Sequence, residues 1–222
     1  MTDPELVDRP QPRRVTEVVP RYRGMKWDVV TETVELDAQT SVRRDVVVHP
    51  GAVGVVAMDD HERVLLLRQY RHPVRSELWE LPAGLLDLDG EDAVVAAQRE
   101  LYEEAHLRAD RWDVLIDVYS SPGMCSEAYR VFLARGLNSV PEAERHVATA
   151  EERDMPLVWV DLDVATSAAS TGRIHNAMAV ASVYAAEHAR DRGWATLRPA
   201  DAPWPERSDR YHRDAERGVT AG

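Results

Sequence analysis

Short segments in which apolar and polar residues alternate recur along most of the chain, and this period of two is typical of β-strands. Residues 52–58 differ, because they form a continuous apolar run suited to a buried strand, preceded by a Pro50-Gly51 turn. The predicted strands are residues 27–36, 44–48, 52–58, 64–68, 114–118, 128–133 and 157–160.

Three other segments are predicted to be helices, and two of them, residues 91–105 and 174–188, have a period of about 3.6 residues. In residues 91–105 the side chains of Val94, Ala97 and Leu101 fall on one side, and Asp161 can cap a short helix that ends at Ser170. Residues 174–188 are rich in Ala and form a third predicted helix. Strands mixed with a few helices predict an α+β fold or an α/β/α sandwich.

The two ends of the chain lack such patterns. Prolines at positions 4, 10, 12 and 20 discourage regular structure in the first 26 residues, where basic side chains outnumber acidic ones. Prolines at positions 199, 203 and 205, among charged residues, predict a poorly ordered tail over 197–222.

Composition narrows the classes of protein that fit. With 222 residues the chain can bury a core of its own, and its single cysteine, Cys125, excludes an internal disulfide and favours a cytoplasmic location. Its apolar runs are shorter than the roughly 20 residues that a spanning helix needs, so we expect no membrane partner. The net charge of −12 argues against a nucleic-acid partner, because phosphates are bound by Lys and Arg.

The acidic excess is concentrated in residues 80–104, which hold eight acidic side chains and one basic one, for a local charge of −7. On a helix Glu100, Glu103 and Glu104 fall within an arc of roughly 100°. Such like-charge pairs destabilise a helix by about 0.2–0.5 kcal/mol each. Arg99 can reach Glu103 but cannot satisfy three carboxylates, whereas Mg²⁺ prefers these oxygen ligands. A solvated acidic helix face is the alternative.

The residues around this face resemble a known family. Gly84, Glu91, Arg99-Glu100-Leu101, Glu103-Glu104 and Leu107 are similar to the signature of the Nudix hydrolases. The resemblance extends over residues 22–185 to the ADP-ribose pyrophosphatase branch. It implies hydrolysis of a nucleoside diphosphate linked to another group, with Mg²⁺, or Mn²⁺ as a substitute, held by Glu100, Glu104 and the Ala83 carbonyl. Glu100 and Glu103 are further assigned to catalysis.

The sequence departs from that signature at two places. The loop between Gly84 and Glu91 holds six residues, one more than the common signature, and a surface turn can absorb this insertion. His106 stands where the signature has glycine. A left-handed residue is expected there, which His adopts at a modest cost. If the helix ended elsewhere, the position of Glu104 would change.

Other residues are assigned to the substrate by the same resemblance. Pro122, sixteen residues after His106, is a mark of the ADP-ribose branch, and Glu127 resembles a carboxylate that contacts the terminal ribose. The remaining substrate-binding residues by this resemblance are Arg44 and Arg71, which suit the diphosphate, and Glu80. Trp27 lies near the adenine-stacking aromatic of the family, although an ordinary buried strand tryptophan is an equal alternative.

The resemblance places the general base on a late loop, where a lid can close over substrate. Glu151 is the expected base and Glu152 the alternative. The expected reaction yields AMP and ribose 5-phosphate from ADP-ribose. The alternatives are another nucleoside diphosphate sugar, an oxidised nucleotide, or a ligand sensor without catalysis. The number of metals and the attacked phosphorus stay open.

The family also implies a domain organisation and an oligomeric state. Residues 1–48 are expected to form a small antiparallel β-domain with a flexible start, and residues 49–196 the Nudix domain. The N-terminal domain is expected to build a domain-swapped homodimer and part of the substrate site. A sheet of so few strands is marginal when alone, which favours such an association.

Overall fold

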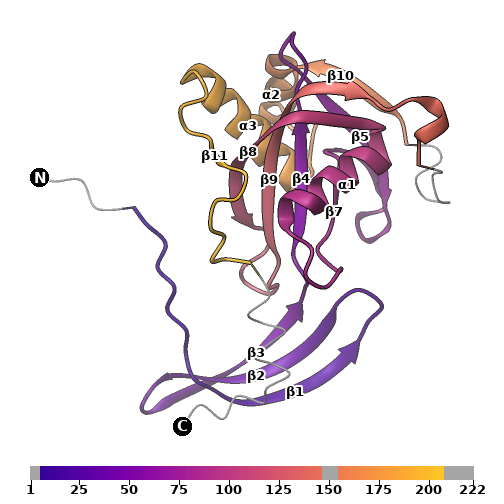
Figure 1. Ribbon diagram of the computed structural model, residues 1–222. Coiled ribbons are helices and arrows are strands. Elements are labelled where there is room, and N and C mark those ends of the chain that lie inside the picture. Colours follow the sequence, from indigo (N-terminus) through magenta and orange to yellow (C-terminus); the bar gives the residue numbers. More distant parts are fainter. Residues whose placement is uncertain (1–5, 147–154, 208–222) are drawn as a thin grey trace, which may run out of the picture.

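The computed structural model describes residues 6–146 and 155–207 of the chain, and shows mixed β-sheets covered by helices on both faces (Figure 1). The strands are β1 (Val15–Arg23), β2 (Asp28–Asp37), β3 (Thr40–Val48), β4 (Ala52–Ala57), β5 (Arg63–Arg71), β6 (Ser76–Glu80), β7 (Ala83–Leu85), β8 (Leu107–Tyr119), β9 (Ala128–Ser139), β10 (Leu157–Asp161) and β11 (Arg198–Pro199). The helices are α1 (Ala93–Ala105), α2 (Leu162–Ser170) and α3 (Ala177–Asp191), with single turns η1 (His72–Val74) and η2 (Glu142–Glu144).

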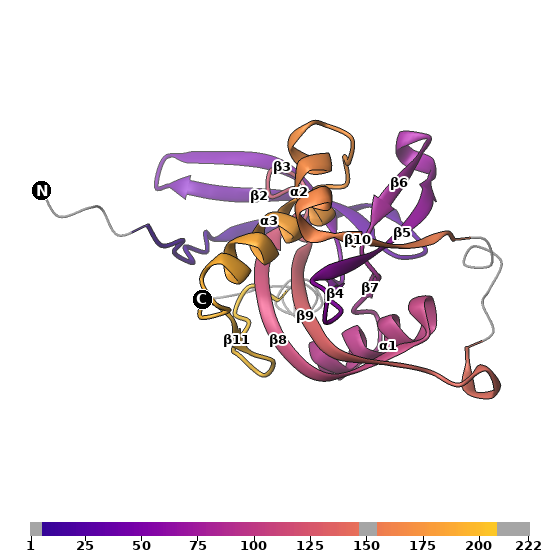
Figure 2. The same cartoon turned by 90° about the horizontal axis from the view of Figure 1, so that it is seen from above.

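The central strand β4 explains why the fold has two layers of helix. It pairs parallel to β9 and antiparallel to β7 in a five-stranded sheet of order β11-β8-β9-β4-β7. Val53 and Val55 pack with Leu101 of α1, whereas Val56 packs with Val183 of α3. Every residue of β4 is buried, as its continuous apolar run predicts, and Figure 2 shows α1 and α3 on opposite sides of it. The predicted sandwich is confirmed.

A second sheet, of order β10-β5-β6, lies beside the first, and β1, β2 and β3 form a separate antiparallel sheet that projects from the body (Figure 1). The projecting sheet is joined to the body through β3, because the Val47 N–H donates to the Met124 carbonyl and the Ser126 N–H donates to the Val47 carbonyl. This junction brings the end of β3 next to the loop that precedes β9.

The prediction of no regular structure in the first 26 residues was wrong for residues 15–23, which form β1. Proline is tolerated because β1 is the outer strand of its sheet, and the pairing is irregular between Pro20 and Tyr22. The prolines at positions 10 and 12 do precede the first strand.

The predicted disorder was also wrong for residues 197–207. Strand β11 pairs with β8, and the nearly inaccessible Arg130 of β9 donates to the carbonyls of Ala202 and Pro203. The Arg130 guanidinium also lies 4.8 Å from the centre of the Trp204 ring. A buried guanidinium needs acceptors, and this segment supplies them in addition to Asp117. Residues 208–222 lie outside the described part of the chain.

Within residues 6–146 and 155–207, no helix combines the length and apolar character that crossing a bilayer requires.

Helix α1 ends at the position expected from the family signature. His106 adopts the left-handed conformation, with φ 53° and ψ 40°, and its N–H donates to the carbonyls of Leu101 and Tyr102. Glu104 is therefore kept in the last helical turn. The buried Nδ1 of His106 has no hydrogen-bond partner among the described residues, which adds a cost to the backbone strain.

We predict that His106→Gly stabilises the protein by about 1 kcal/mol, because glycine adopts the left-handed conformation freely. For a chain of this length the melting temperature should rise by about 2–4 °C. Thermal unfolding of the variant tests this, with His106→Ala as the control, since alanine removes the ring but keeps the strain. Equal stabilisation by both variants, or none by glycine, would contradict the explanation.

Candidate active site

A cleft of about 480 Å³ lies where the ends of several strands meet, between the projecting sheet and the helix-covered body. Four residues predicted from the sequence line it together: Arg71 at the end of β5, Glu80 at the end of β6, Ala83 in β7 and Glu127 just before β9. Strand ends are suited to this task, because the sheet holds the backbone while each last side chain faces open space.

The acidic face of α1 joins the cleft at its Ala83-Gly84 edge. Glu104 accepts a hydrogen bond of 2.9 Å from the Ala83 N–H. A side-chain carbon on Gly84 would collide with the Glu100 carboxylate, so glycine leaves the space that this carboxylate occupies. The two glutamates predicted as metal ligands thus lie against the same short strand.

Arg99 partly compensates the negative charge of this helix face. Its guanidinium makes two bonds of 3.0 Å to Glu91 and one of 2.5 Å to Glu100, and lies 3.4 Å from Glu103. These carboxylates, Glu91 above all, raise the pKa of Arg99, so it stays cationic. Burial raises the pKa of Glu100 above its ordinary value, although the adjacent Arg99 opposes this shift. The carboxylate of Glu100 is therefore incompletely compensated.

These residues fit a hard divalent cation. Within residues 6–146 and 155–207, no group of three or more His, Cys, Asp or Glu forms a ready-made cage. Mg²⁺ does not need one, because it is commonly held by one or two carboxylates, with water and substrate phosphates as further ligands. Glu104 supplies a carboxylate bonded to the Ala83 backbone, and Glu100 supplies a second one in the space beside Gly84.

Arg71 and Glu80 form a fork-to-fork pair at the wall of the cleft. Nε and Nη2 of Arg71 donate to the two oxygens of Glu80 at 3.0 and 2.7 Å, and Glu80 is only 4% exposed. This carboxylate raises the pKa of Arg71. Glu80 thus fixes the plane of the guanidinium, whose half-exposed edge can meet a phosphate.

Trp27 and Tyr129 also line the cleft. Trp27 is 47% exposed, so the interpretation of Trp27 as a buried strand residue was wrong. Tyr129, at the start of β9, was not singled out by the sequence, because it falls in a strand that is mostly core. Burial raises the pKa of its hydroxyl far above the usual range, which keeps that group protonated.

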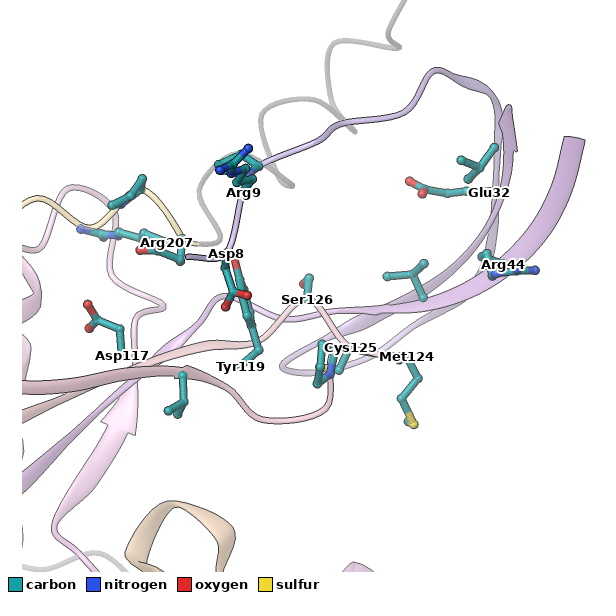
Figure 3. A pocket seen from close by; sticks show the side chains of 18 of the residues that line it. Asp8, Arg9, Glu32, Arg44, Asp117, Tyr119, Met124, Cys125, Ser126 and Arg207 are labelled. Carbon is teal, nitrogen blue, oxygen red and sulfur yellow. The ribbon is translucent and has the colours of Figure 1, made fainter. Parts of the chain in front are cut away.

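Arg44 lies in a different place from the other predicted substrate residues. It belongs to β3 and contributes to a hollow with Glu32, Met124 and Cys125, drawn in Figure 3. Its Nη1 donates to the carbonyl of the adjacent Arg43. Within one chain, Arg44 is therefore not among the described residues that line the cleft with Arg71.

The expected general base, Glu151, and its alternative, Glu152, lie outside the described residues. His49, which also lines the cleft, was missed as a site residue. Its one signal in the sequence is that it interrupts the otherwise apolar stretch before the Pro50-Gly51 turn.

Known proteins resemble this chain in sequence and in fold. The model of the NUDIX domain matches residues 48–180. An ADP-ribose pyrophosphatase of Mycobacterium tuberculosis is 45% identical over 197 residues, which cover 88% of this chain and 93% of that protein. An ADP-ribose pyrophosphatase of Bacillus subtilis is 33% identical over 156 residues, or 70% of this chain and 82% of that protein.

A solved structure described as an ADP compounds hydrolase has a similar fold. Its TM-score is 0.67 at 22% sequence identity, and the match covers 85% of this chain and all of the other. The family match spans α1 and the strands around it, and the structural match shows the same overall fold. The chain belongs to the Nudix family.

Proposed function

We propose that this protein hydrolyses the diphosphate of ADP-ribose, giving AMP and ribose 5-phosphate, with Mg²⁺ as its metal. The observation that carries the proposal is the junction at Ala83-Gly84, where the acidic face of α1 meets the cleft that holds Arg71 and Glu127. Two similar proteins named ADP-ribose pyrophosphatase support the choice of substrate. The single cysteine favours action in the cytoplasm.

Each residue of the site is assigned a role that follows from its position. Glu100 and Glu104 are assigned to hold the metal, which when bound neutralises the diphosphate and lowers the pKa of a bound water. Arg99 bonds to Glu100 and Glu103 and so reduces the repulsion between these two carboxylates. Arg71, fixed by Glu80, pairs with diphosphate oxygens. Glu127 accepts sugar hydroxyls, and Glu151, or else Glu152, takes the proton of the attacking water.

We also propose that two chains form a domain-swapped dimer. The sheet β1-β2-β3 projects from the body (Figure 1). It exposes large apolar side chains that include Val18, Tyr22 and Leu36. A three-stranded sheet of this kind is stabilised by packing against another element. The partner's copy of this sheet would bring a second Arg44 toward the cleft, which one chain alone does not do.

For the metal site, Glu104→Gln should lower turnover by at least about a hundredfold at any Mg²⁺ concentration, because the amide removes a ligand charge. Steady-state rates over a Mg²⁺ titration measure this. Glu142→Gln, an exposed glutamate on η2, is the matched control and should behave as wild type. Unchanged turnover in Glu104→Gln would refute the assignment.

For the substrate, kcat/KM should be higher for ADP-ribose than for GDP-mannose by at least about tenfold, or about 1.4 kcal/mol of transition-state binding. A product assay with both substrates decides this. A preference for GDP-mannose would reassign the substrate to another nucleoside diphosphate sugar. Failure to hydrolyse any member of the class would favour the ligand sensor.

For the dimer, sedimentation equilibrium should give about twice the chain mass of 25.0 kDa at micromolar concentration. The physical reason for association is that the exposed apolar side chains of the projecting sheet can be buried against a second chain. A mass of one chain over the whole concentration range would contradict the dimer, and with it the route by which Arg44 reaches substrate.

A further inference from the structure

His49 is a buried polar residue at the junction between the projecting sheet and the cleft. It follows the last residue of β3 and is 7% exposed. Its backbone N–H donates to Ser126 Oγ at 2.9 Å, in the loop that carries Glu127. The backbone of His49 is thus fixed to that loop, and its ring faces the cleft.

The hydrogen bond at Nδ1 determines the tautomer of the ring. The Gly51 N–H donates to Nδ1 at 3.1 Å, which requires a lone pair on that nitrogen. The neutral ring therefore carries its proton on Nε2. Nε2 lies 3.5 Å from Oε1 of Glu127, so a donor faces the carboxylate assigned to the sugar.

The flat face of the same ring contacts Trp27. The two ring centres are 5.7 Å apart, and the planes are inclined by only 25°, which is a stacked arrangement. Since Trp27 is 47% exposed and lines the cleft, the His49 ring supports an indole whose remaining surface is open to a planar ligand. Trp27 comes from the connection between β1 and β2 of the projecting sheet, directly before β2, whereas Glu127 comes from the body.

We propose that His49 is a specificity-determining positioning residue, which holds Trp27 and Glu127 in the register that recognises the nucleoside and sugar ends of the substrate. This inference rests on the proposed function. His49 acts through its two neighbours and does not touch the reacting phosphates. It should therefore affect ground-state binding, seen in KM, more than the chemical step, seen in kcat.

Two substitutions separate the functions of the two ring nitrogens. In His49→Asn the amide oxygen can still accept from the Gly51 N–H, but the donor toward Glu127 and the stacked ring are lost. In His49→Gln the longer side chain can place an N–H near the position of Nε2 and so restores the contact with Glu127. His61→Asn, on an exposed turn, is the matched control.

Steady-state kinetics with ADP-ribose and saturating Mg²⁺ should show a KM about tenfold higher for His49→Asn, with kcat within about twofold of wild type. His49→Gln should recover part of this loss. In a double-mutant cycle with Glu127→Gln, the two effects on KM should combine to less than their product, because one substitution acts through the other residue.

Three results would overturn the inference: an unchanged KM in His49→Asn, a loss confined to kcat, or effects that multiply fully in the cycle. If thermal unfolding shows that His49→Asn does not fold, the cycle is measured with His49→Ala in its place, because His49→Gln keeps a donor toward Glu127. A wild-type protein without ADP-ribose turnover would overturn the proposed function itself. An active wild type with a normal His49→Asn variant would overturn this inference alone.

Discussion

The burial of a carboxylate against the backbone of β7 is the constraint on which the site depends. Glu100 occupies the space left by the absent side chain of Gly84, and Glu104 is bonded to the adjacent Ala83 N–H. Burying a charge is unfavourable unless it is compensated, and Arg99 offsets the charge of Glu100 only in part, since its guanidinium is also bonded to Glu91. A divalent cation bound at this edge, as proposed, would complete the compensation. The chain order then sets the position of such a cation relative to Arg71, because β7 follows closely after Glu80, the last residue of β6, and Glu80 is bonded to Arg71.

Much of this arrangement follows from periodicity and spacing. The spacing of Glu100, Glu103 and Glu104 places them on one helix face, and the apolar run of β4 predicts the buried central strand that supports the helix. The left-handed end of α1 at His106 was predicted through the family resemblance, because the signature has glycine at this position. These features are local, so neighbouring residues determine them. The clustering of Arg71, Glu80, Ala83 and Glu127 was predicted only through the family resemblance.

Features that depend on distant partners were not predictable. Pro20 discourages a strand in general, yet β1 forms because it has β2 on one side and no strand to satisfy on the other. The segment at 198–204 has an unstructured composition, but the buried Arg130 requires the carbonyls of Ala202 and Pro203. The role proposed for His49 depends on its contacts with Trp27 and Glu127, which are separated by a hundred positions in the sequence. In each case the decisive contact joins residues that no single window of sequence contains.

The central claim, that Glu100 in the Gly84 space is a metal ligand, can be tested without turnover. Mn²⁺ titration followed by electron paramagnetic resonance measures free ion, and hence affinity, for wild type and for Gly84→Ala. Gly84 does not have a positive φ, and the three atoms nearest to an added methyl group all belong to the Glu100 side chain, so alanine disturbs chiefly this side chain. Gly123→Ala, where nothing lies within 4 Å, is the control. If Glu100 is a ligand, Gly84→Ala weakens Mn²⁺ binding at least about tenfold while Gly123→Ala does not. Equal affinity in wild type and Gly84→Ala would contradict it.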